Sequence, residues 1–302
     1  MDFIKLFSDN TSGIMAAVLS MLFFGIADSF WKAPVRTLGP AKTIFFRNLL
    51  VVVLVGIFFI GGNSKSYFNE DAIKATLVLS VISYLGLFFF AKAQGTGKIS
   101  IVVPISNTNT LIPLLLSVIM LEKAINNIAI AGLGVTIIGL LLIKLQIFDQ
   151  GKVVWKMIWE TGTRFALLAA LFWGVSYGFA YIAVAFTGVA LFSIMLESII
   201  LALSFLHTLL IRKSLGFTDE EFKLNFKYII IIGIFGALGT LFNTYALDNA
   251  SINTVCGILT LAPIISIIIG RTVFKEQVLT QQKIGTFLII AGIFVVAYFR
   301  NY

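Results

Sequence analysis

Two apolar segments about 150 residues apart carry nearly the same sequence. LFFGIA at 22–27 matches LFWGVS at 171–176, and Phe30, Gly39 and Ala41 reappear in step as Phe179, Gly188 and Ala190. A repeat of this length makes each half one packing unit, which buries its apolar surface against its copy. Each half holds five apolar stretches, and because five is odd, the second half must enter a bilayer from the opposite side. Inverted repeats of this kind place a site between the halves, near the middle of the membrane.

Composition places these stretches in a membrane. Of the 302 residues, 59% are hydrophobic and 12% are charged, and the mean hydropathy is +1.02. A soluble domain carries about twice that share of charge, and a helix needs roughly 20 mostly apolar residues to cross a bilayer. The sequence predicts ten such helices: Gly13–Trp31, Thr43–Ile60, Ala75–Ala91, Ile99–Leu121, Ile128–Leu145, Phe165–Phe186, Val189–Ile211, Tyr228–Leu247, Ile252–Val273 and Ile284–Phe299.

We therefore expect an all-α membrane protein with ten transmembrane helices, arranged as two inverted five-helix repeats. The first repeat covers residues 1–146 and the second covers 165–302, with an interfacial linker at 147–164. In this linker Trp155 and Trp159 are four residues apart, with lysines beside them. That spacing suits a short helix at headgroup depth, and an irregular linker is the alternative.

A second repeated pattern follows the fourth and ninth stretches. Each of these stretches ends at a glutamate, and a helix with two glycines seven residues apart comes next. Glycines at this spacing share one helix face, where a neighbouring backbone can approach closely. The residues concerned are Glu122, Gly132 and Gly139 in the first half, and Glu276, Gly285 and Gly292 in the second.

Together with the repeated Phe/Trp-Gly near the start of each half, this pattern resembles the EamA-like branch of the drug/metabolite transporter superfamily. The resemblance covers nearly the whole chain, but Leu121 and Lys275 stand where the family often has a glycine before the glutamate. It implies a ten-helix carrier for a small metabolite, with a cavity between the repeats and both termini in the cytoplasm. The charge pattern predicts the opposite orientation, because loops on the side of the termini carry five Lys/Arg residues and those on the other side carry fourteen.

The densest polar segment inside an apolar stretch is Ser106–Thr110, bracketed by Pro104 and Pro113. Five consecutive polar residues point all round a helix, so a kinked or broken helix that lines a wet cavity explains them best. Hydrogen bonding between helices is the alternative. We expect Asn107, Asn109, Asn243 and Asn253 to bind the substrate, and Pro104, Pro113 and Pro263 to kink the helices around it.

Two carboxylates lie within apolar stretches. Glu197 is offset by 149 residues from Asn48, so Arg47 is its natural partner across the two halves. Glu197 is either a proton carrier or substrate-amine ligand, with Arg47 in the substrate site, or half of a structural ion pair. Asp28 is either a second proton-coupling carboxylate or the local partner of Lys32, four residues further on.

Two other functional classes compete with transport. Gly174–Gly178 fits the G-x-S-x-G pattern of serine hydrolases, so an intramembrane hydrolase would use Ser176 with His207, the only histidine. That mechanism needs a strained strand-to-helix turn, whereas these residues lie inside a helix, and His207 is better explained as an interfacial residue. A membrane scaffold without transport activity is the other rival.

We expect a non-enzymatic secondary transporter that moves a small polar or zwitterionic metabolite across the cytoplasmic membrane by alternating access. The sequence shows no ATPase motif and no metal-ligand cluster, so we expect no cofactor and no metal, and a gradient of protons or sodium would drive any active transport. The net charge of +8 comes from scattered basic residues rather than a stripe, so we expect no nucleic-acid partner. The lipid bilayer and a small-molecule substrate are the expected partners of a monomer.

Overall fold

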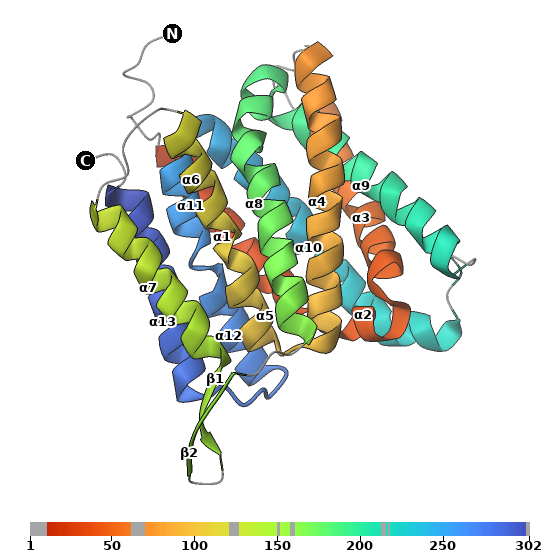
Figure 1. Cartoon of the computed structure of the whole chain (residues 1–302). Coiled ribbons are helices and arrows are strands. Elements are labelled where there is room, and N and C mark those ends of the chain that lie inside the picture. Colours follow the sequence, from red (N-terminus) through yellow and green to blue (C-terminus); the bar gives the residue numbers. More distant parts are fainter. Residues whose placement is uncertain are drawn as a thin grey trace.

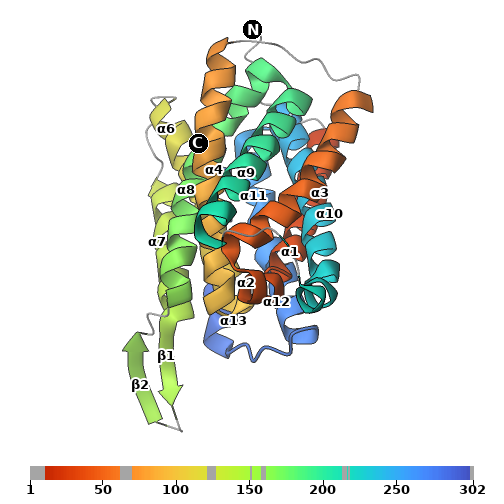
Figure 2. The same ribbon diagram turned by 90° about the vertical axis from the view of Figure 1, so that its right-hand side faces the viewer.

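The protein forms one bundle of helices, from one end of which a short β-hairpin projects (Figures 1 and 2). The computed structural model describes residues 11–61, 70–120, 127–149, 152–157, 161–212, 216 and 218–299. The first half contains α1 (Thr11–Ser29), α2 (Lys32–Leu38), α3 (Pro40–Gly61), α4 (Glu70–Thr96), α5 (Ile99–Ser106), a 3₁₀ turn (Asn107–Thr110), α6 (Leu111–Met120) and α7 (Asn127–Lys144). The second contains α8 (Thr161–Thr187), α9 (Val189–Arg212), α10 (Asp219–Asn249), α11 (Ile252–Leu259), α12 (Ala262–Thr272) and α13 (Thr280–Phe299).

The ten predicted crossings are found in this arrangement. Within the described residues, nine helical segments are long and apolar enough to cross a membrane, and α7 is a shorter apolar helix. The fourth crossing consists of α5, the 3₁₀ turn and α6, and the ninth consists of α11 and α12. The fourth crossing is thus broken at Asn107–Thr110, within the polar segment where the sequence predicts a break.

The linker differs from the expectation. Leu145–Asp149 forms strand β1 and pairs antiparallel with β2, Lys152–Met157 (Figure 1). The prediction of an interfacial helix through Lys152, Trp155 and Lys156 is therefore wrong, and Trp159 lies outside the described residues. The adjacent valines Val153 and Val154 favour extended backbone more than helix, a preference that outweighs the spacing of the tryptophans.

The two halves are inverted relative to each other, as α7 and α13 show. A Cβ atom added to Gly132 would lie 2.8 Å from the backbone oxygen of Gly292, and one added to Gly139 would lie 2.6 Å from that of Gly285. The pairing runs in opposite directions along the two helices, so they pack antiparallel. Because they are the last helices of their repeats, antiparallel packing means that one repeat is upside-down relative to the other.

The other contacts between the halves obey the same pseudo-twofold symmetry. Helix α1 packs on α10, and α4 packs on α8, which is the same pair with the halves exchanged. Helices α3 and α9, which are equivalent to each other, also pack together. The pair of α7 and α13 lies at one side of the bundle and the pair of α3 and α9 at the other (Figure 1).

The repeats also differ locally. At the end of the bundle that carries the hairpin, which we call the hairpin end, the first half breaks between α1 and α2, whereas α8 continues unbroken through the equivalent segment at the opposite end (Figure 1). Pro34 cannot donate a backbone hydrogen bond and explains the break, since its counterpart in α8 is Ala183. Both halves then turn at a glycine of positive φ, Gly39 at 81° and Gly188 at 83°, a conformation that other residues rarely adopt.

Replacement of Gly292 by alanine should destabilise the fold, because the new methyl group would collide with Thr136 and with the backbone of Gly132. Overpacking of this kind costs roughly 1–3 kcal/mol. Gly134→Ala is the matched control, because nothing lies within 4 Å of its Cβ position. Thermal unfolding in detergent should show a lower Tm for Gly292→Ala alone, and equal melting of the two variants would contradict the close crossing.

Candidate binding cavity between the two halves

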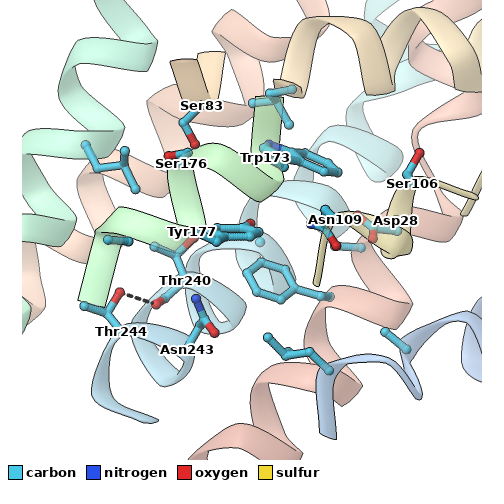
Figure 3. A pocket seen from close by; sticks show the side chains of 18 of the residues that line it. Asp28, Ser83, Ser106, Asn109, Trp173, Ser176, Tyr177, Thr240, Asn243 and Thr244 are labelled. Atoms are coloured by element: carbon cyan, nitrogen blue, oxygen red, sulfur yellow. Dashed lines mark hydrogen bonds between the residues drawn. The ribbon is translucent and has the colours of Figure 1, made fainter. Parts of the chain in front are cut away.

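A cavity of about 100 Å³ lies between the halves (Figure 3). Among the described residues its wall comes from α1, α3, α4, α8, α9, α10 and the two broken crossings, whereas α7 and α13 contribute none of the lining. Ser106, Asn107, Asn109 and Thr110 reach it from the break of the fourth crossing, and Leu259 and Ala262 reach it from that of the ninth. Both breaks therefore lie at the level of the cavity.

Equivalent positions of the two repeats line this space together. The lining pairs related by an offset of 149 residues are Phe24 and Trp173, Ala27 and Ser176, Asp28 and Tyr177, Trp31 and Ala180, Arg47 and Leu196, Ser83 and Ile232, Leu87 and Gly236, and Thr110 and Leu259. Most of these pairs differ in size or polarity. The duplicated backbone thus builds a symmetric frame, and the substitutions give its two sides different chemistry.

Glu197 is held by three donors from other helices. Its Oε2 accepts hydrogen bonds from Arg47 Nη1 at 2.9 Å and from Asn48 Nδ2 at 2.8 Å. Thr240 Oγ1 donates to Glu197 Oε1 at 2.9 Å. Arg47 is the partner that the repeat offset indicates, and both charged residues are at least 95% buried. This arrangement supports the structural ion-pair reading of Glu197, and its role as a proton carrier stays a prediction.

A small residue makes room for this ion pair. A Cβ atom at Gly236 would lie 2.7 Å from Arg47 Nη2, so any larger side chain would push the guanidinium aside. The equivalent residue in the first half is Leu87, and the positions equivalent to Arg47 and Glu197 are Leu196 and Asn48. The repeat therefore offers no second ion pair of this kind, and the network makes the site asymmetric.

Asp28 does not pair with Lys32. Lys32 Nζ donates instead to Glu276 Oε1 at 2.8 Å, in the other half of the protein, so the prediction of a local pair is wrong. The break between α1 and α2 separates the two residues, and a regular i,i+4 pair requires a continuous helix. Asp28 and Asn109 both line the cavity, and the carboxylate of Asp28 has no hydrogen-bond or ion-pair partner among the residues that the structure describes (Figure 3).

Glu276 joins the halves at the hairpin end. Besides Lys32 it accepts hydrogen bonds from the backbone N–H groups of Ile99 and Ser100 and from the Ser100 hydroxyl. Burial alone would raise the pKa of Glu276, but these hydrogen bonds and the charge of Lys32 together lower it below its usual range. The preceding residue, Lys275, has a φ of 51°, in the left-handed region that glycine adopts most easily.

The cavity is closed at the hairpin end. Trp31, the lining residue of the first half nearest that end, is 2% exposed and packs edge-on against Phe90. The Lys32–Glu276 ion pair lies next to it along the chain. At the opposite limit of the lining, Leu247 is only half-buried and lies two residues from the end of α10. Its surroundings are thus more open than those of Trp31.

Most residues that the sequence proposes for the site meet at this cavity. Asn107, Asn109 and Asn243 line it together with Arg47, Asp28 and Glu197, whereas Asn253 in α11 is outside the lining. Asn253 follows the first residue of its helix, far from the break at Leu259–Ala262. Of the three prolines, Pro104 lies inside α5, Pro113 near the start of α6, and Pro263 at the start of α12.

Sequence reasoning missed the aromatic part of the wall. Phe24, Trp31, Trp173, Tyr177 and Phe192 all line the cavity. An aromatic residue in an apolar stretch looks like ordinary core or lipid-facing surface. The repeat offset of 149 residues could have indicated one of these aromatic residues, because the position equivalent to Asp28 at this offset is Tyr177.

Ser176 and His207 do not form a nucleophile–base pair. Ser176 Oγ donates to the backbone oxygen of Leu79, and the His207 Nδ1 atom hydrogen-bonds Tyr84 Oη. Both partners are in α4, five residues apart, which separates the two contacts by about 7.5 Å along the helix axis. Each side chain is thus engaged elsewhere, and neither is placed to activate the other.

The Arg47–Glu197 pair should show strong coupling in a double-mutant cycle. Arg47→Met or Glu197→Leu alone leaves a buried charge without its partner, which costs roughly 3–5 kcal/mol. The double variant leaves no charge, so its loss should be well below the sum of the two single losses. Chemical unfolding in mixed micelles measures the loss in free energy of unfolding for each single variant and for the double variant. If the two single losses simply add up in the double variant, the ion pair does not stabilise the fold.

Glu276→Gln should lower the free energy of unfolding by roughly 1–3 kcal/mol, because hydrogen bonds to a charged acceptor are lost. The pKa of this carboxyl is lowered in the folded state from its ordinary 4.5. Its stabilisation is therefore complete at pH values above 4.5 and is lost as the pH falls through the folded-state pKa. Melting curves of the wild type and the variant should converge in acid, and a constant difference in Tm across this range would contradict the ion pair.

Comparisons with known proteins agree with the fold. A crystal structure of a protein 16% identical to this chain superposes with a TM-score of 0.66 and covers 97% of this chain and 98% of its own. At that identity the likeness shows the fold alone. A comparison with curated proteins finds no match. The model of the EamA-like transporter family matches twice, at residues 11–145 and 161–298, so the chain belongs to this family, within the drug/metabolite transporter superfamily.

Proposed function

We propose that the protein is a secondary transporter for a small polar or zwitterionic metabolite, working by alternating access in the cytoplasmic membrane. The observation that carries this proposal is a cavity between two inverted halves whose wall holds charged, amide and hydroxyl groups. Such groups are costly in a membrane interior and are retained where they face a solute pathway or one another. A scaffold has no need of a polar cavity at its centre.

The proposed movement uses the contacts between the halves. In the structure the hairpin end is closed, with Trp31 buried and Lys32 paired with Glu276. We expect the solute to reach the cavity from the opposite end in this state. Rocking of one half against the other would then separate Lys32 from Glu276 and open the hairpin end. Helices α7 and α13, whose backbones meet closely at their glycines and which line no part of the cavity, would hold the halves together during this movement.

The coupling candidates are Asp28 and Glu197. A carboxylate that carries a proton must exchange it with water and lose its counter-charge during the cycle. Asp28 has no bonded partner among the described residues, whereas Glu197 is held by Arg47, Asn48 and Thr240. We therefore propose Asp28 as the first choice for proton coupling and Glu197 as the second. The monomer is the proposed transport unit, because both halves of the pseudo-dimer are in one chain.

Ala180→Trp tests the transport proposal. Ala180 lines the cavity at the position equivalent to Trp31, so a second indole there would fill the space that a solute needs. Uptake of a pool of labelled polar metabolites into proteoliposomes should fall to the protein-free background. Gly134→Ala, which changes only open space on α7, should transport like the wild type.

Wild-type protein that transports no member of a broad pool, in either direction, would refute the proposal. Full uptake by a well-folded Ala180→Trp variant would show that the solute takes a different path.

A further inference from the structure

We propose that the solute carries an amino group, whose ammonium binds between the Asp28 carboxylate and the Asn109 side chain. This inference deepens the proposed function and rests on it. The sequence offers Glu197 as one candidate for binding an amine, but the carboxylate of that residue is already bonded to Arg47, Asn48 and Thr240. The structure therefore points to Asp28 for this role.

The first argument for an amine is the charge balance of the cavity wall. Among the described residues, the charged side chains that line the cavity are Asp28, Arg47 and Glu197. Arg47 and Glu197 neutralise each other at 2.9 Å, which leaves the carboxylate of Asp28 as the charge without a direct partner in the described lining. A charge in a membrane interior is expensive unless it is paired, so a cationic group is the solute feature that this wall favours most.

The second argument is that amide oxygens in the cavity wall lack hydrogen-bond donors. Asn109 is 6% exposed, and its Oδ1 has no hydrogen-bond partner in the described part of the chain. The same holds for Oδ1 of Asn243, which is 7% exposed and also lines the cavity. Asn109 and Asn243 line the same cavity as Asp28, and all three are labelled in Figure 3. An ammonium group has three donors and no acceptor, so it can satisfy a carboxylate and an amide oxygen at once.

The third argument is the number of aromatic residues in the cavity wall. Phe24, Trp31, Trp173, Tyr177 and Phe192 surround the same space. Aromatic faces attract cations and exclude anions, because the ring quadrupole places negative charge on the face. Asp28 would repel a carboxylate or phosphate solute, and each ring face turned towards the cavity would add to that repulsion. The wall therefore selects an amine over an acid of the same size.

Three probes with the same carbon skeleton separate the charge classes: butylamine, 4-aminobutyrate and butyrate. Trp31 and Trp173 line the cavity, so intrinsic fluorescence of the purified full chain in detergent reports binding at neutral pH. We expect butylamine and 4-aminobutyrate to bind and butyrate to bind more weakly or not at all. An amine that binds no better than butyrate overturns the inference, and this comparison needs no variant.

Asp28→Asn should weaken amine binding about tenfold or more, because it removes the charge while it keeps the shape. Asn109→Ala should weaken it less, and Asp28→Glu should restore part of the affinity. Asp71→Asn is the matched control, since Asp71 is an exposed acid in the first turn of α4, outside the cavity. Amine affinity in a folded Asp28→Asn protein equal to that of the wild type overturns the inference. If the protein transports neutral or acidic solutes in proteoliposomes but binds no amine, this inference alone is refuted. If it transports no solute at all, the proposed function is refuted.

Discussion

The rest of the structure depends on one constraint, the need to bury polar backbone and side-chain groups inside a bilayer. A duplicated five-helix unit meets it by packing against its own inverted copy, so that polar groups of both units face inward rather than lipid. Close approach of backbones at Gly132 and Gly292, and of Gly139 and Gly285, ties the outer helices of the two halves together. The remaining helices are thereby left to enclose the cavity.

The two repeats give the cavity a symmetric backbone frame, and the different side chains at equivalent positions give its two sides different chemistry. Asp28 faces the cavity at the position where the second half has Tyr177, and Trp31 does so where the second half has Ala180. Asp28 and Tyr177 both lie inside helices, so that substitution changes charge and volume on similar backbones, whereas Trp31 lies in the break between α1 and α2 and Ala180 inside the continuous α8. An asymmetric solute needs an asymmetric wall, and this is how a pseudo-symmetric protein provides one.

The buried ion pair shows what a sequence offset can predict. Equivalence of Glu197 with Asn48 placed Arg47 beside Glu197, because equivalent helices must meet near a pseudo-twofold axis. The same reasoning could not predict Thr240 as a third partner, since it comes from α10 and is not related to the others by the repeat. Nor could it show that Lys32 crosses to Glu276, because that contact depends on the break between α1 and α2.

By itself the sequence determined the membrane class, the number of crossings, the inversion of the halves and the broken fourth crossing. These follow from apolar length, an odd number of stretches and the local effects of proline and consecutive polar residues, all of which act along the chain. Only the tertiary structure decided which polar groups are paired and which are free. It committed Glu197 to Arg47, left Asp28 facing the cavity and placed Asn253 outside it. Pairing depends on distances between helices that are far apart in the sequence, and local patterns do not fix those distances.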